Sequence, residues 1–406
     1  MKEFELRLQT QPPKRTFTMR TFPPPADRSF RKPGPTALPI LATLTLIALM
    51  LGPPRVTAQG FDCGSTGAYG ALNVTNDMTL DMPADGVFNC TTINVDAGKT
   101  LRFKRNPLNT PVYLLATGDV TINGTIDLSG NNYSGSSPGT GGPGGFDGGY
   151  GGLSISGYST PGDGHGPGKG TAQYAPAAFA QIYGNNTNVY GNSWLSPLIG
   201  GSGGAGSAGN PGLGGGGGGG AILIASNSKI SVVGAVICNG GYGAGSGSGG
   251  AIRLVAPIVT GSGSLTAAGG PWGAGTGRIR VDCPDDYSFR QLVMSGVSSR
   301  GSRMIVFPAV LPRLDIIEAA GQTIAEGTPA EVVVQLPAGA STNQTVTVQA
   351  RNFTSDVPIS VVVTPENAAS TNYDATISLG SGDPPKVTVN IAIPPGMKSH
   401  IHAWTR

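Results

Sequence analysis

The sequence predicts an all-β protein in which a parallel β-helix or β-solenoid with a long Gly-rich insertion precedes a small β-sandwich. Three observations predict this class. Three stretches of the chain repeat one pattern of short alternating strands with glycines between them. Of the 406 residues, 66 are glycine, and most of them lie between these stretches. Beyond about Arg313 glycine becomes rare while the alternating strands continue.

The first element, residues 1–58, has the pattern of a secretion signal. A basic segment, RSFRK, precedes an apolar run at 37–51, and VTA at 56–58 supplies a small-x-small cleavage site before Gln59. The apolar run is about 15 residues long, short of the roughly 20 that a membrane span needs. We therefore expect a cleaved signal peptide, a secreted or cell-surface chain, and no stable membrane span after cleavage.

The formal net charge of +3 originates in this leader. Residues 1–58 hold nine of the 26 basic and three of the 23 acidic side chains, which leaves 17 basic and 20 acidic ones in the remainder. The mature chain is therefore slightly acidic, and we expect no nucleic-acid partner.

The repeated pattern defines the predicted body, residues 59–309. The copies are VYLLATGDVTINGTIDLSG from Val112, ILIASNSKISVVGAVICNG from Ile222, and IRLVAPIVTGSGSLTAAG from Ile252, and a truncated copy begins at Ile279. Three short strands with glycine corners suit one coil of a stack, in which each coil buries its inward side chains against the next. Period-two alternation makes five side chains of the second copy inward: Ile222, Ile224, Ile230, Val232 and Val236. Residues 72–105 show the same alternation and predict the first, capping coils.

Residues 129–219 form the predicted Gly-rich insertion, which is too long for an ordinary loop. Seven consecutive glycines close it at 214–220. A phosphate-binding loop would need a helix after the glycines and a lysine at a fixed place, whereas these lead into the strand-like run AILI at 221–224. We therefore interpret the heptaglycine as a corner that returns the chain to the stack.

Residues 313–406 predict an immunoglobulin- or fibronectin-like β-sandwich. Turn signals such as PAGAST and GSGDPP separate about seven short alternating strands. These are LDIIEAA, EVVVQLP, TVTVQARNF, PISVVVTP, YDATISLG, VTVNIAI and HIHAWTR.

Four cysteines in an exported chain permit two disulfides. Cys63 and Cys90 bracket the capping segment, and we predict a disulfide between them. Cys238 and Cys283 fall two coils apart by the repeat register, too far for a bridge. We expect Cys238 to be a buried free thiol in the inward column with Leu128 and Ala267, and the state of Cys283 stays open.

Parallel β-helices include polysaccharide lyases and glycoside hydrolases, which need clustered carboxylates or a basic residue with bound calcium. The acidic residues of the body are sparse and show no acid–base pair at a usable spacing. Asp147 and Asp163 could touch calcium, but the glycine–aspartate nonapeptide of calcium solenoids is missing. We therefore predict no catalytic residue and no cofactor, with a secreted polysaccharide-active enzyme as the alternative.

Tyr113, Leu223, Arg253 and Arg280 take equivalent outward places in successive copies. Two arginines about 4.8 Å apart repel each other unless they are solvated or share an acidic partner. The column is either a binding strip for an anionic glycan or a plain exposed ladder.

His400 and His402 alternate onto one face of the last predicted strand. Two ligands without a third are weak evidence for a metal, so we predict an edge strand and no metal site. His165, in GDGHGPG, is interpreted as a loop residue.

The segment NTPVYLLATGDVTINGTIDLSG, followed by Gly-rich coils, resembles secreted glycine-rich β-helical proteins of bacteria. The likeness extends over roughly residues 60–283, and passenger domains of adhesins and autotransporters are similar in architecture. The resemblance implies an exported protein with a solenoid body, and it supplies no reaction and no functional residue. We therefore expect an exported, non-enzymatic structural or adhesive protein of the cell surface or matrix, with polysaccharides or other surface proteins as partners.

The predicted leader has a direct test. Amino-terminal sequencing of the exported protein should begin at Gln59, because signal cleavage follows the small-x-small site. Recovery of the intact leader in the membrane fraction would contradict cleavage and indicate an anchor.

Overall fold

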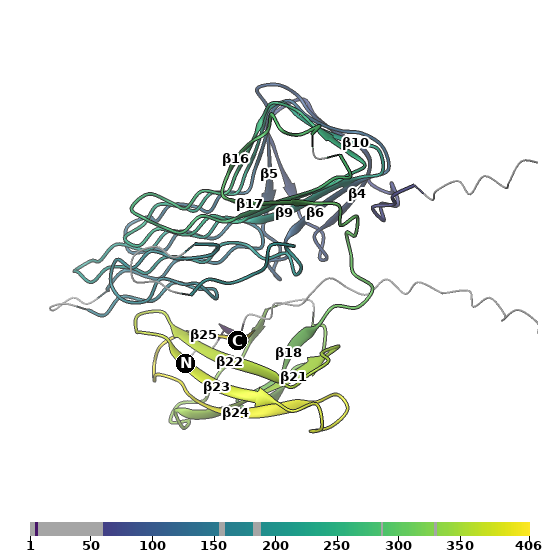
Figure 1. Cartoon of the computed structure of the whole chain (residues 1–406). Helices are drawn as coiled ribbons and strands as arrows, with labels where there is room; N and C mark the ends of the chain where they lie inside the picture. Colours follow the sequence, from purple (N-terminus) through teal and green to yellow (C-terminus); the bar gives the residue numbers. More distant parts are fainter. Residues whose placement is uncertain (1–4, 7–59, 154–158, 182–187, 286, 329–330) are drawn as a thin grey trace, which may run out of the picture. The chain divides into compact units, whose positions relative to one another are not determined.

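The computed structural model describes residues 5–6, 60–153, 159–181, 188–285, 287–328 and 331–406 (Figure 1). Apart from residues 5–6, the predicted signal peptide lies outside the described residues. Every regular element of the described chain is a β-strand, so the predicted all-β class is confirmed. Among these residues no helix is long and apolar enough to cross a membrane.

The first part of the chain consists of three rows of parallel strands (Figure 1). The first row contains β6 (Val112–Ala116), β9 (Ala221–Ser226), β12 (Ala251–Val255), β15 (Arg278–Asp282) and β17 (Val297–Gly301). The second contains β7 (Val120–Ile122), β10 (Lys229–Val232) and β13 (Ile258–Thr260). The third contains β3 (Met78–Asp81), β5 (Thr100–Lys104), β8 (Thr125–Asp127), β11 (Ala235–Ile237), β14 (Ser264–Thr266) and β16 (Val293–Ser295).

One long strand, β4 (Val87–Val95), joins the first two rows. Its first half pairs with β6 and its second half pairs with β7, and β2 (Gly70–Val74) pairs with β4 on the other side. Each complete repeat copy thus contributes one strand to each row, as the three-strand unit of the sequence predicts. The predicted capping segment supplies the strands that precede β6, β7 and β8 in the rows.

The register of the copies agrees with the sequence alignment. Ile252 pairs with Ile222 on one side and with Ile279 on the other, and these are the predicted steps of 30 and 27 residues. In the third row, Val236 pairs with Ile126 and Leu265. The five side chains predicted to point inward all belong to the buried core that the three rows enclose.

Two further sheets have mainly antiparallel pairing, and all their strands except β1 follow residue 312. One sheet contains β18 (Arg313–Ala319), β19 (Gln322–Thr323), β21 (Asn343–Arg351) and β24 (Lys386–Ala392). The other contains β1 (Glu5–Leu6), β20 (Val332–Val333), β22 (Val357–Pro365), β23 (Thr371–Ile377) and β25 (Ser399–Thr405). Both sheets contribute to one apolar core. All seven strands expected from residue 313 onward are present, whereas the short β19 and β1, which falls in the predicted leader, were not predicted.

The seven glycines at 214–220 are not a corner. All of them are buried, and their amide groups donate to three different neighbouring segments in turn. The neighbour that accepts changes with a period of three residues. Gly215 and Gly218 donate to the carbonyls of Gly149 and Phe146. Gly216 and Gly219 donate to those of Gly245 and Ser248, and Gly217 and Gly220 donate to those of Asn131 and Leu128. Three residues per turn without internal hydrogen bonds is the geometry of a polyproline II-type helix.

The carbonyl groups of the same segment accept from further neighbours with the same period. Gly215 and Gly218 accept from residues 139 and 142, and Gly216 and Gly219 accept from residues 204 and 201. The heptaglycine is therefore the centre of a bundle of extended segments, which we call the glycine array: residues 128–152, 162–170, 200–220 and 240–250. Figure 1 draws these segments as extended teal ribbons that run side by side. Much of the described part of the predicted insertion is thus hydrogen-bonded structure.

Close backbone contact explains why glycine fills the centre of the array. A Cβ atom added at any residue from 214 to 220 would lie 2.0 to 2.7 Å from a backbone carbonyl oxygen of a neighbouring segment. Backbone atoms cannot move aside as the end of a flexible side chain can. Only glycine fits, as it does at the axis of the collagen triple helix.

The predicted disulfide between Cys63 and Cys90 is wrong, because both are buried free thiols. Cys90 lies on β4 opposite Ala116, and its side chain belongs to the interior core. Cys63 packs with Leu115 on the outer face of the first row, and its thiol donates to the Ala116 carbonyl at 3.2 Å. The strand row lies between the two sulfur atoms. Burial raises the pKa of Cys90 to about 11, so its thiol stays protonated and unreactive at neutral pH.

The prediction for Cys238 is confirmed. It is a free thiol with no exposed surface, and it lies in the interior core with Leu128 and Ala267. Cys283 is free as well, and its thiol donates to the carbonyls of Pro257 and Asp285 at 3.4 and 3.3 Å.

The glycine array predicts an unusual sensitivity to alanine. Gly217→Ala would place a Cβ atom 2.2 Å from the Thr140 carbonyl oxygen. We expect it to lower the free energy of unfolding by about 2 kcal/mol or more, since packed backbone must separate to admit the methyl group. Urea denaturation followed by circular dichroism measures the change.

Gly380→Ala is the matched control, because residue 380 is exposed and the nearest atom to its added Cβ is 3.9 Å away. Its effect should stay within about 0.5 kcal/mol. Equal stability of the two variants would contradict the packed array.

Candidate functional site

Tyr113, Leu223, Arg253 and Arg280 form a continuous column across the first strand row. Leu223 pairs with Tyr113 and with Arg253, and Arg253 pairs with Arg280. The four side chains are therefore in register on β6, β9, β12 and β15, at the equivalent places that the sequence repeats indicate.

The exposure expected for this column is wrong. The four residues are 6, 1, 2 and 7% exposed in chain order. Leu195 and Leu198 from the insertion and Val306 from the segment after β17 pack over this face, and the Phe307 ring lies 5.1 Å from that of Tyr113. Burial raises the pKa of the Tyr113 hydroxyl. Strand alternation shows which face a side chain takes, but it does not show what covers that face.

Asp282 is the acidic partner of both arginines. Arg253 donates from Nε and Nη2 to its Oδ2 at 3.0 and 2.8 Å, and Arg280 donates from Nε and Nη2 to its Oδ1 at 3.0 and 2.6 Å. The Arg303 amide adds a further bond to Oδ1 at 3.0 Å. The carboxylate is fully buried and accepts five hydrogen bonds, which saturates its lone pairs.

The remaining guanidinium groups also bind the protein itself. Arg253 Nη2 donates to the Arg303 carbonyl at 3.1 Å, and Arg280 Nη1 donates to the Arg300 carbonyl at 3.0 Å. Burial lowers the pKa of Arg253, and Asp282 opposes this shift. An anionic glycan would have to displace the covering segment to reach the column. The glycan-binding hypothesis for these four residues therefore stays a prediction, and the geometry favours a structural role.

A cavity of about 110 Å³ lies beside the column, and its lining includes Tyr113, Leu223, Arg253 and Leu198. Small-molecule sites are commonly about 300 Å³ or larger. The cavity therefore suits a few water molecules better than a sugar chain.

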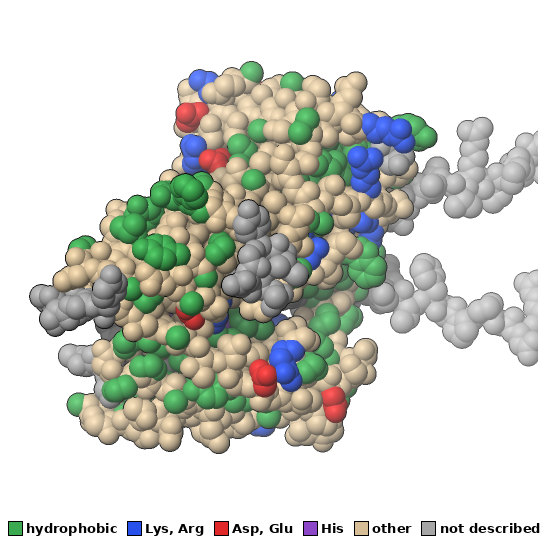
Figure 2. Space-filling model, turned by 60° about the vertical axis from the view of Figure 1, so that its left-hand side comes forward, with side chains coloured by type: hydrophobic (Ala, Val, Ile, Leu, Met, Phe, Trp, Pro, Cys, Tyr) green, Lys and Arg blue, Asp and Glu red, His purple; other side chains and the backbone are tan. Residues whose placement is uncertain are grey.

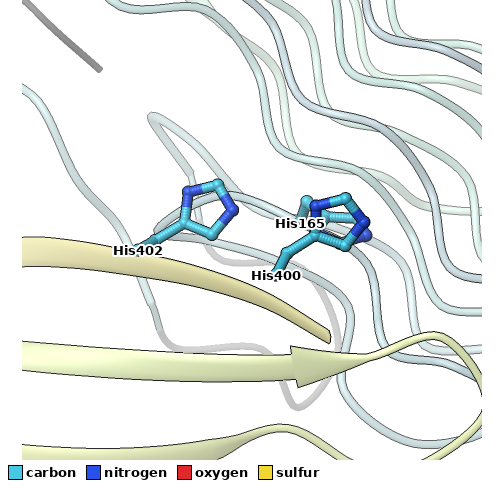
Figure 3. A group of neighbouring side chains, drawn as sticks. All are labelled: His165, His400 and His402. Atoms are coloured by element: carbon cyan, nitrogen blue, oxygen red, sulfur yellow. The ribbon is translucent and has the colours of Figure 1, made fainter. Parts of the chain in front are cut away.

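All three histidines of the chain lie together (Figure 3). His400 and His402 are alternate residues of β25, and His165 comes from the predicted insertion. One ring nitrogen of each lies within 4.8 Å of the others. Strand alternation indicates the pair His400 and His402 but not the third member, because nothing in the sequence around His165 indicates what it contacts.

The two aspartates considered for calcium have protein partners. Asp147 forms an ion pair with Arg105 and accepts from the Gly141 amide at 2.8 Å. Asp163 accepts from the Ala172 amide at 3.0 Å and from the Ser370 amide and hydroxyl at 2.9 and 2.7 Å. These bonds occupy the oxygens that calcium would need.

Comparison with known proteins finds no match: no protein-family model, no curated protein and no solved structure matches this chain. The function proposed below therefore depends on the chain's own residues.

The buried ion cluster predicts a large effect of one isosteric change. Asp282→Asn should lower the free energy of unfolding by about 3–5 kcal/mol, because two buried guanidinium groups lose their counter-charge. The control is Asp119→Asn, whose carboxylate is half-exposed and 3.8 Å from Lys229. It should change stability by less than about 1 kcal/mol. Chemical denaturation of both variants checks this, and a wild-type midpoint for Asp282→Asn would contradict it.

Proposed function

We propose that this chain is an exported structural or adhesive protein of the cell surface or extracellular matrix, without enzymatic activity. Its body, residues 59–309, is a β-solenoid that the glycine array widens on one side. Residues 313–406 form a β-sandwich that serves as a spacer or docking module. The partners are polysaccharides or other surface proteins.

A stiff body supports this proposal. The three strand rows are paired in register from the capping segment to β17 and enclose one continuous apolar core. The array adds buried backbone hydrogen bonds in several directions. Structure that is bonded to several neighbours resists local opening, and this suits a load-bearing or presenting element better than a moving catalytic lid.

The observation that carries the adhesive function is a set of exposed aromatic side chains at turns near the glycine segments. Trp272 is 77% exposed and Tyr174 is 55% exposed. Both residues have positive φ angles, 67° and 61°, a backbone region that bulky residues rarely adopt. Holding a large ring in strained backbone at an exposed turn costs stability, and such strain is typical of functional positions.

The other exposed side chains of the Gly-rich segments also suit binding through aromatic rings and apolar groups. Further exposed apolar residues in the Gly-rich segments are Leu153, Val189, Trp194, Leu213 and Tyr242. Figure 2 shows one face of the described chain on which hydrophobic side chains gather in patches while charged ones are few. Rigid aromatic side chains give a large contact area at a small entropy cost, and their flat faces suit sugar rings. Polysaccharide is therefore the partner that we favour.

Retention on a panel of immobilised neutral and anionic polysaccharides, with and without calcium, tests the proposal. We expect wild-type protein to bind at least one glycan without releasing products. Removing both rings, with Trp272→Ala and Tyr174→Ala combined, should weaken binding about tenfold, since two ring contacts contribute about 1.4 kcal/mol together.

Tyr287→Ala is the control, because Tyr287 is as exposed as the two test rings, at 69%, but the Arg290 guanidinium covers one face of its ring, 3.7 Å from the ring centroid. It should bind as wild type does. New reducing ends or unsaturated products would support the alternative of a secreted polysaccharide-active enzyme. Unchanged binding by the double variant would overturn the assignment of these two rings.

A further inference from the structure

We propose that His165, His400 and His402 form a structural zinc site that links the Gly-rich insertion to strand β25. The inference goes beyond the proposed adhesive function and does not depend on it. Its starting point is that the chain has three histidines, of which His165 precedes the other two by 235 and 237 residues, and that all three imidazoles lie in one cluster.

The geometry suits one small cation. Two imidazoles on a tetrahedral zinc ion have ring centroids about 5 Å apart, given zinc–nitrogen bonds of about 2.0–2.1 Å. The His165 ring centroid lies 4.7 Å from that of His400 and 6.1 Å from that of His402. The ligand nitrogens lie within 4.8 Å of one another, so a small rotation of the rings would bring them to a shared metal.

The donor set selects the kind of metal. Three imidazole nitrogens suit zinc and related transition metals, whereas calcium and magnesium prefer oxygen ligands. Zinc takes four ligands in a tetrahedral arrangement; His₃ supplies three of them, and a water molecule would take the fourth position. We therefore assign Zn²⁺, and not the calcium considered for the nearby aspartates.

Burial indicates a structural site and not a catalytic one. His165, His400 and His402 are 9, 6 and 5% exposed, so a bound ion would be shielded from large substrates. Aromatic packing also holds the strand side of the cluster. The His402 ring stacks on Trp404 with centroids 5.3 Å apart, and Phe146 packs edge-on against both rings.

The same two regions of the chain are already joined beside the histidines. Asp163, two residues before His165, accepts both hydrogen bonds from Ser370, which adjoins strand β23. This carboxylate also interacts electrostatically with the buried Lys169, so it is not a free extra charge for the metal. A zinc ion would add a second link, made of coordinate bonds, to this hydrogen-bonded one.

Zinc titration of the full chain, produced without a polyhistidine tag and stripped with a chelator, tests the proposal. We expect one Zn²⁺ per chain by calorimetry and no binding of Ca²⁺. Co²⁺ should give the visible absorption of a four-coordinate ion. His165→Ala, His400→Ala and His402→Ala should each reduce zinc affinity by at least about 100-fold, since loss of a ligand exceeds the 10–100-fold effect of losing an outer-shell partner.

Phe146→Leu is the matched control, because it changes packing against His402 and keeps every ligand; its zinc affinity should stay within about threefold of wild type. A second measurement needs no variant. The wild-type imidazole ¹H–¹⁵N spectrum has three histidine spin systems, and one equivalent of zinc should shift all three. No stoichiometric binding, or shifts in fewer than three histidines, would overturn the site, and neither result would bear on glycan retention.

Discussion

The structure depends on the requirement that buried backbone amide and carbonyl groups be hydrogen-bonded. Segments without side chains cannot be stabilised by apolar burial, and glycine loses more conformational freedom on folding than any other residue. In the array, each heptaglycine amide donates to a neighbouring segment and the carbonyls accept from others. Each such bond contributes only about 0.5–1.5 kcal/mol net. Many bonds in a cooperative bundle are therefore needed before 214–220 can be ordered at all.

The strand rows and the array depend on each other because the chain passes directly between them. β8 leads into the array after Asp127, and Gly220 leads directly into β9. The Gly220 carbonyl accepts from the first residue of β12, and its amide donates to Leu128 just after β8. The apolar core fixes the register of the rows, and that register sets where each array segment begins. The apolar strands thus position glycines that have no side chains to specify their own neighbours.

This division explains how much of the fold the sequence predicts. Ile222, Ile252 and Ile279 show their register because apolar alternation is visible along the chain. The heptaglycine shows nothing comparable, since a period of three in backbone bonding leaves no trace in hydropathy. For the same reason, the sequence did not show which segments cover or contact one another when they are far apart along the chain. These contacts are Leu195 over the arginine column, the strand row between Cys63 and Cys90, and His165 beside β25. Asp282 was missed as well, although it lies two residues after Arg280 on the same strand and hence on the same face.

The chain uses its few polar groups in two different ways. Inside, Asp282 is saturated by Arg253, Arg280 and a backbone amide, so this ion cluster has no group left to bind an outside ligand tightly. Outside, the exposed turns present rings such as Trp272 instead of charges. Contact through rings on a rigid frame needs no charge complementarity, and salt would weaken it little. The proposed His₃ site belongs with these interior polar groups, because a metal bound there would fix one segment against another and leave the surface unchanged. In the proposed function, recognition belongs to the exposed turns, and the strand rows and the glycine array beneath them hold those turns in place.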